Sequence, residues 1–311
     1  MYEIPGAYRS LHPARSSSAG TTAKRIIFKA AIIGLLKVKG ESCMKIAVTG
    51  KGGVGKTFIA GTLAASFVKA GHKVIALDAD SSPNLGVTLG LSAEDAAAII
   101  PVAENEQLIR KKTGTEFSGV FRLTFTVDDI ITACAVPTPS GVNLIVMGTV
   151  RSMGSGCMCA ANSLVKALLR HLVVERNELV ILDMEAGMEH LGRGTAEHVD
   201  IMMVVTDANR KSLDIAGRIC TIAAKSNITN IGLVGNRITG PVQEDVIRRF
   251  AERTGLTVFT IIPFDQQVAD AGVTGLAIDE TSSGALPEIR RLTELLVKMG
   301  CAKGMPSYPG G

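Results

Sequence analysis

This 311-residue chain contains no tryptophan, and aromatic residues make up only 4% of it. Proteins that bind single-stranded nucleic acid stack the bases on aromatic side chains, so this composition disfavours that function. The formal net charge of +4 is unevenly placed, because residues 1–43 hold seven of the 33 basic residues and two of the 29 acidic ones. The other 26 basic and 27 acidic residues leave residues 44–311 near neutrality. We therefore expect no broad nucleic-acid-binding face.

Long apolar segments are also missing. The run IIFKAAIIGLL at residues 26–36 is shorter than the roughly 20 residues that span a bilayer, and Lys29 interrupts it. We therefore expect no membrane partner. The six cysteines are scattered and lack the density of a secreted disulfide scaffold. A reducing, cytoplasmic location is predicted.

The two ends of the chain differ from its centre. Residues 1–43 begin with an aperiodic stretch rich in serine, arginine and glycine, and MKIAVTGKGG from Met44 already reads as a protein N-terminus. We expect residues 1–43 to be a disordered or mis-assigned leader, with a targeting segment as the alternative. Residues 301–311 are predicted to form a flexible tail, which leaves residues 44–300 as a single domain.

Short apolar runs alternate with amphipathic segments from residue 44 onward. The runs are continuous, as in strands that are buried on both faces of a parallel sheet. This alternation predicts an α/β fold with one doubly wound, mostly parallel sheet, interrupted by an insertion at residues 92–141. Strands are predicted at 45–50, 73–78, 142–147, 179–184, 200–207, 230–236 and 256–263, and helices at 57–71, 163–176, 210–226, 241–255 and 286–300.

The segment GKGGVGKT at residues 50–57 matches the phosphate-binding pattern G-x-x-x-x-G-K-[ST] between a predicted strand and a predicted helix. Its glycines allow successive backbone N–H groups to turn toward phosphate oxygens, and the helix N-terminus adds positive potential. We expect Lys56 to contact the β- and γ-phosphates of ATP and the Thr57 hydroxyl to bind Mg²⁺. The predicted nucleotide-binding residues of this loop are Gly52, Gly53, Val54, Gly55, Lys56, Thr57 and Phe58.

A second lysine, Lys51, lies early in the same loop. In this respect the chain resembles the deviant Walker A P-loop NTPases, which include the nitrogenase iron protein and the Min and Par ATPases. The resemblance implies a homodimer in which Lys51 reaches the nucleotide of the partner subunit and takes part in catalysis. It also implies catalytic and magnesium-binding roles for Asp80 in LDADSSPNL and Asp183 in VILDMEAG. Asp80 would orient or deprotonate the attacking water, and Gly187 would sense the γ-phosphate.

Two later segments match the part of this family that lies near adenine. VGNR contains Asn236 and Arg237, and IPFD contains Pro263. The resemblance therefore adds these three residues to the predicted nucleotide site.

Cys157 and Cys159 are one residue apart in GSGCMCAAN. In an extended segment their side chains point to the same face, so two thiolates could bind one metal ion at about 2.3 Å. A disulfide across one residue would be strained, while two unengaged thiols remain the plain alternative. No second closely spaced pair occurs in the chain, and we expect Cys134 and Cys220 to be ordinary apolar side chains. A two-fold dimer would complete a tetrahedral Ni²⁺ or Zn²⁺ site between two protomers.

GCMCAAN and DMEAGMEHLGRGT, together with the phosphate loop, resemble the CooC-type nickel-insertion ATPases across nearly all of residues 44–300. The resemblance implies an ATP-hydrolysing metallochaperone that inserts nickel into the C-cluster of its client, carbon monoxide dehydrogenase. ATP binding would close the homodimer and hydrolysis would reopen it, so that metal affinity follows the nucleotide state.

Two other functions stay open, an iron–sulfur cluster carrier and a Min- or Par-like positioning ATPase. The near-neutral domain and the narrow apolar stripe of residues 286–300 disfavour positioning on DNA or membrane. Several residues after Asp183 are candidate ligands of a second nickel site: Glu185, Glu189, His190, Glu197 and His198. Their spacing matches no metal-ligand pattern, so a solvated helix explains these residues better.

Overall fold

The computed structural model describes residues 44–114, 127–148, 157–174, 178–185, 198–226, 228, 230–274 and 281–300. At residues 157–163 it describes the backbone but not the side chains. The predicted leader and the predicted tail lie outside these ranges, so the predicted domain boundaries stay predictions.

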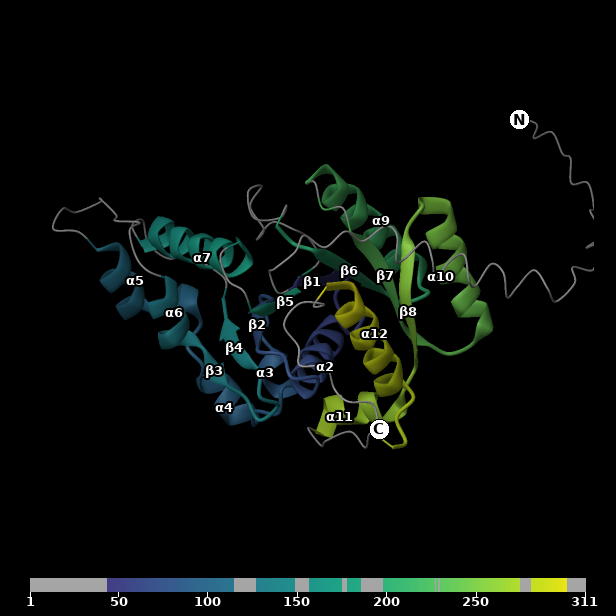
Figure 1. The fold of residues 1–311 in the computed structure, drawn as a ribbon, viewed down its shortest axis with the longest axis horizontal. Helices are drawn as coiled ribbons and strands as arrows, with labels where there is room; N and C mark the ends of the chain where they lie inside the picture. Colours follow the sequence, from purple (N-terminus) through teal and green to yellow (C-terminus); the bar gives the residue numbers. More distant parts are fainter. Residues whose placement is uncertain are drawn as a thin grey trace, which may run out of the picture. The chain divides into compact units, whose positions relative to one another are not determined.

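In the described part of the chain, one eight-stranded sheet forms the centre of the fold (Figure 1). Its strand order is β3-β4-β2-β5-β1-β6-β7-β8, and every neighbouring pair is parallel except β3 and β4. The strands are β1 (Lys45–Gly50), β2 (Val74–Ala79), β3 (Val136–Pro137), β4 (Asn143–Val146), β5 (Leu179–Met184), β6 (Ile201–Thr206), β7 (Ile231–Ile238) and β8 (Thr257–Pro263).

The central strands are apolar on both faces because helices cover both sides of the sheet. Every residue of β1, β2, β5 and β6 is buried. This explains why the strands read as continuous apolar runs in the sequence. The predicted α/β fold with a mostly parallel sheet is confirmed.

Helices connect the strands. On one face, α2, α3 and α12 pack against the sheet, and on the other α7, α9 and α10 do so (Figure 1). The helices are α2 (Lys56–Lys69), α3 (Leu85–Thr88), α4 (Ala93–Ala98), the 3₁₀ helix η1 (Val102–Glu104), α5 (Glu106–Thr113), α6 (Val127–Cys134), α7 (Cys157–Val174), α9 (Arg210–Lys225), α10 (Pro241–Thr254), α11 (Gln266–Thr274) and α12 (Ala285–Gly300).

The last helix docks on the domain's own sheet. Ile289, Leu292 and Leu296 are buried in the same apolar cluster as Phe67 of α2. Full burial of side chains of this size is worth about 2 kcal/mol each. The apolar stripe is therefore used inside the domain, as its narrow width predicted. No helix among the described residues is both long and apolar enough to cross a membrane.

Candidate functional site

The phosphate loop joins β1 to α2 at the C-terminal edge of the sheet, where ligands of such folds bind. Gly53 and Gly55 have φ angles of 82° and 94°, which residues with a side chain rarely adopt. Gly52 and Gly53 are exposed, and a Cβ atom on either would meet nothing within 4 Å. The loop thus presents bare backbone to the space above it, as a phosphate cradle requires.

Lys56 is the first residue of α2, and only 6% of it is exposed. Its Nζ lies 4.0 Å from Oδ2 of Asp80. Asp80 is held by the loop after β2, since its Oδ1 accepts a hydrogen bond of 3.0 Å from the Ser82 amide. The structure therefore brings together two of the predicted catalytic residues. Lys51 is partly exposed on the same loop, where a partner subunit could reach it.

Asp78 shapes the loop that carries Asp80. Its buried carboxylate accepts hydrogen bonds from the backbone N–H groups of Leu85, at 2.9 Å, and Asp80, at 3.2 Å. Burial raises the pKa of Asp78, and these two hydrogen bonds oppose the rise. The sequence showed this aspartate only as a strand end, so its role in folding the loop was missed.

Asp183 lies in β5 beside Val48 of β1 and Asp78 of β2. Burial, together with the nearby charges of Asp78 and Asp80, raises its pKa to about 7, although the Thr57 hydroxyl and the Lys56 ammonium act in the opposite direction. Neither carboxylate oxygen has a hydrogen-bond partner among the described residues. Such a buried carboxylate is costly unless a cation or donor satisfies it.

This arrangement fits a magnesium ion. Mg²⁺ prefers oxygen ligands and is bound in nucleotide sites through one or two protein groups plus phosphate oxygens. The Thr57 hydroxyl lies close enough to the unsatisfied Asp183 carboxylate to lower the pKa of that group. Asp80, the third predicted magnesium residue, is oriented toward Lys56 instead.

The predicted base-contacting residues lie on neighbouring strands. Asn236 is 5% exposed in β7, and its side-chain amide donates a hydrogen bond of 2.8 Å to the Val54 carbonyl of the phosphate loop. Arg237 has a φ of 58°, the one positive value at a non-glycine position in the described ranges. Pro263 pairs with Ile238 at the ends of β8 and β7. Contacts of these residues with adenine stay predictions.

The backbone at the cysteine pair differs from the prediction. We expected an extended segment before a helix, but α7 already begins at Cys157 and includes Cys159. Helical residues two apart do not share a face, so the argument from an extended segment is wrong. The positions of the two sulfur atoms lie outside what the structure describes, and the metal site stays a prediction.

Cys134 and Cys220 agree with the expectation for them. Burial raises the pKa of the Cys134 thiol, and it raises that of Cys220 to about 11. Cys220 is buried in the apolar core and Cys134 packs half-buried against it, as predicted for ordinary apolar side chains. Within the described ranges, no three histidine, cysteine, aspartate or glutamate side chains converge on one point as a metal site would require.

Most of the candidate ligands after Asp183 cannot be placed. Glu189, His190 and Glu197 lie outside the described residues, and so does Gly187, the predicted γ-phosphate sensor. Glu185 and His198 are exposed, which agrees with a solvated segment.

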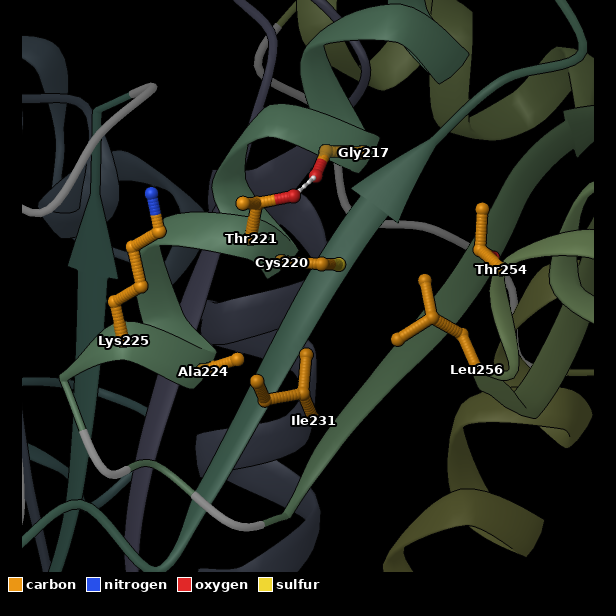
Figure 2. Close-up of a pocket in the computed structure, with 8 residues that line it drawn as sticks. All are labelled: Gly217, Cys220, Thr221, Ala224, Lys225, Ile231, Thr254 and Leu256. Atoms are coloured by element: carbon orange, nitrogen blue, oxygen red, sulfur yellow. Dashed lines mark hydrogen bonds between the residues drawn. The ribbon is translucent and has the colours of Figure 1, made fainter.

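A surface cavity of about 620 Å³ lies between α9, the first residue of β7 and the segment that joins the end of α10 to β8 (Figure 2). The phosphate loop follows the other end of its strand, β1, in the same parallel sheet. Its hydroxyl groups are already bonded to their own helices, Thr221 to the Gly217 carbonyl at 2.9 Å and Thr254 to the Phe250 carbonyl at 2.8 Å. No catalytic group predicted from the sequence lines it.

The fold and the loop geometry define a nucleotide-binding protein of the P-loop class. Residues 45–278 match the family model of the CobQ/CobB/MinD/ParA nucleotide-binding domain. The chain belongs to this family, and it is an ATPase, as predicted from the phosphate loop.

Similar proteins cover nearly the whole domain. The carbon monoxide dehydrogenase accessory protein CooC of Rhodospirillum rubrum is 39% identical over 84% of this chain and 100% of its own. An uncharacterized ATP-binding protein of Methanocaldococcus jannaschii is 39% identical over 82% of this chain and 98% of its own. The resemblance to CooC-type proteins is thereby confirmed.

Solved structures support the fold. The cell-division ATPase MinD of Pyrococcus furiosus superposes with a TM-score of 0.59 at 16% identity, over 83% of this chain and 99% of that one. The cobyrinic acid a,c-diamide synthase of Mycobacterium smegmatis gives 0.55 at 16% identity, over 86% and 100%. At these identities the likeness shows the fold alone.

Proposed function

We propose that this protein is an ATP-driven maturation factor of carbon monoxide dehydrogenase, which works in the cytoplasm as a homodimer and delivers nickel to the C-cluster of that client. The observation that carries the proposal is the 39% identity over the full length of the Rhodospirillum rubrum accessory protein. The orphaned Asp183 carboxylate beside Lys56 and Thr57 supports the ATP-dependent part.

In the proposed reaction, the loop N–H groups bind the phosphates and the Lys56 ammonium moves from Asp80 to the β- and γ-phosphate oxygens. Thr57 and Asp183 would hold Mg²⁺, which neutralises phosphate charge when it is bound. Asp80, released by Lys56, accepts a hydrogen bond or proton from the attacking water. A bond forms from that water to the γ-phosphorus, the bond to the bridging oxygen breaks, and ADP and phosphate leave. Lys51 contributes its charge to the partner's nucleotide.

Nickel is the cargo in this scheme. Because α7 begins at Cys157, the backbone of both cysteines belongs to its first turn. Two copies of the pair would give a tetrahedral thiolate site of the kind that Ni²⁺ or Zn²⁺ occupies. Closure of the dimer around ATP would then change the geometry of the shared site.

The test is activation of a nickel-free client. Carbon monoxide dehydrogenase made without nickel is incubated anaerobically with Ni²⁺, ATP and the full chain, and CO oxidation is measured. We expect the wild type and Cys220→Ala to activate the client, and both Lys56→Ala and the Cys157→Ala/Cys159→Ala double variant to fail. The double variant should still hydrolyse ATP. Full activation by the double variant would contradict the metal role, and a brown iron–sulfur cluster in the purified protein would favour the carrier alternative.

A further inference from the structure

We propose that Asn236 is a positioning residue for ATP hydrolysis, which fixes the shape of the phosphate loop independently of any contact with the base. The proposal rests on the ATPase activity of the family and not on the metal or the client.

A hydrogen bond joins the part of the site predicted to lie near adenine to the phosphate loop. The Asn236 Nδ2 atom donates to the Val54 carbonyl at 2.8 Å, and the two residues are 182 positions apart in the sequence. Both are nearly inaccessible to solvent, with 5% of Asn236 and 1% of Val54 exposed. Loss of the donor would leave the Val54 carbonyl buried without its partner, which costs more than an exposed hydrogen bond.

Gly55 makes room for this bond. A Cβ atom at position 55 would lie 2.4 Å from the Asn236 amide nitrogen. Glycine is therefore needed at this position for two reasons, its φ of 94° and the space that the Asn236 side chain occupies. The loop and the strand fit one another at the residue directly before Lys56.

The backbone around Asn236 departs from a regular strand. The pairing of β7 with β8 shifts register between Gly235 and Ile238, and Arg237 adopts the left-handed region. A non-glycine residue in that region costs on the order of 1 kcal/mol and persists only where the surroundings enforce it. The irregularity falls on the residues that flank and follow Asn236, where a strand side chain must reach the phosphate loop.

The hydrogen bond to Val54 allows two roles of Asn236 to be distinguished, contact with the base and positioning of the phosphate loop. One N–H of the amide is engaged with Val54, which leaves the second N–H and the side-chain oxygen available to a base. If Asn236 acted only through the base, its removal would not affect a ligand that has phosphates and no base. If it positions the loop, such a ligand must be affected as much as ATP.

A matched control lies at the other end of the same strand. Asn230, directly before β7, also donates its side-chain amide to a backbone carbonyl, that of Asp200, at 2.8 Å. This bond has the same chemistry and length, is part-buried instead of buried, and lies at the edge of the sheet away from the phosphate loop. Asn230→Ala therefore reports the general cost of losing such a bond.

The experiment measures the affinities of the full chain for Mg²⁺-ATP and for Mg²⁺-tripolyphosphate by calorimetry, in the wild type, Asn236→Ala and Asn230→Ala. We expect Asn236→Ala to weaken both ligands by the same factor, about tenfold for a buried hydrogen bond, and to raise the KM for ATP. Asn230→Ala should change neither affinity, although its thermal stability falls. Asn236→Ser, which is too short to reach Val54, replaces Asn236→Ala if the latter does not fold.

Two results would overturn the proposal. Weaker ATP binding with unchanged tripolyphosphate binding would show that Asn236 acts through the base alone. Equal losses in the Asn236 and Asn230 variants would show a general effect on the sheet. Failure of the nickel or client experiments would leave this outcome untouched, because tripolyphosphate binding involves neither.

Discussion

The Thr49 hydroxyl donates a hydrogen bond of 3.0 Å to the Glu185 carbonyl. Thr49 is fully buried at the end of β1, immediately before the phosphate loop, and Glu185 follows β5. The bond ties the strand that leads into the phosphate loop to the backbone that leaves Asp183. The two halves of the predicted magnesium site are thus held in register by a side chain that no motif marks.

Replacing Thr49 by valine should weaken magnesium binding. Valine keeps the branched shape but leaves the Glu185 carbonyl without its donor, which costs about 1 kcal/mol. We expect a higher Mg²⁺ concentration for half-maximal ATPase activity in Thr49→Val, measured by phosphate release. Thr49→Ser keeps the hydroxyl and should retain the wild-type value. An unchanged magnesium requirement in Thr49→Val would separate this bond from the site.

Lys56→Ala should abolish hydrolysis while the apo protein stays folded. The ammonium is the charge that the phosphates need, and its interaction with Asp80 at 4.0 Å is a long one. We expect a loss of at least about 100-fold in kcat, with little change in the melting temperature. Lys69→Ala, in the last turn of the same helix, is the control and should hydrolyse ATP normally. Substantial activity in Lys56→Ala would remove the central cation from the mechanism.

The raised pKa of Asp183 predicts a dependence of stability on pH. Its folded pKa of about 7 lies above the ordinary aspartate pKa of 3.8, so between these values the folded apo protein keeps a proton that the unfolded chain loses. The contribution of Asp183 to the free energy of unfolding therefore falls as pH rises through this window. A shift of this size corresponds to a few kcal/mol.

Urea unfolding of the wild type and Asp183→Asn at pH 5 and pH 8, without nucleotide or Mg²⁺, measures this effect. We expect the variant to gain stability relative to the wild type as pH rises. Saturating Mg²⁺-ADP should reduce that gain, because a bound cation stabilises the ionised carboxylate. A difference between the two proteins that stays constant with pH would mean that Asp183 is ionised in the apo fold.

Continuous apolar runs were enough to predict seven strands, with ends at most two residues from those observed. The antiparallel β3 was missed because Val136–Pro137 is too short to give a pattern. The four-residue α3 was missed for another reason. It begins where the Leu85 amide meets the Asp78 carboxylate, a contact that periodicity cannot reveal.

The candidate site also has features that the sequence predicts and features that only the fold shows. The phosphate loop could be predicted because its residues are contiguous, and their spacing reflects the geometry of a bound phosphate. The bond between Asn236 and Val54 joins distant segments, so only the fold shows it. The extended conformation predicted at Cys157 was wrong because the segment CMCAAN carries little helical periodicity, yet α7 starts there.

The central claim, a metal site shared by two protomers and controlled by nucleotide, is tested most directly by sedimentation combined with metal analysis. Wild-type protein, Lys51→Ala and Cys157→Ala/Cys159→Ala are each equilibrated with Ni²⁺ and the slowly hydrolysed analogue of Mg²⁺-ATP. The account predicts a wild-type dimer with one nickel ion per two chains, loss of the dimer in Lys51→Ala, and loss of the metal in the cysteine variant. A wild-type monomer, or nickel bound equally well without the two cysteines, would contradict it.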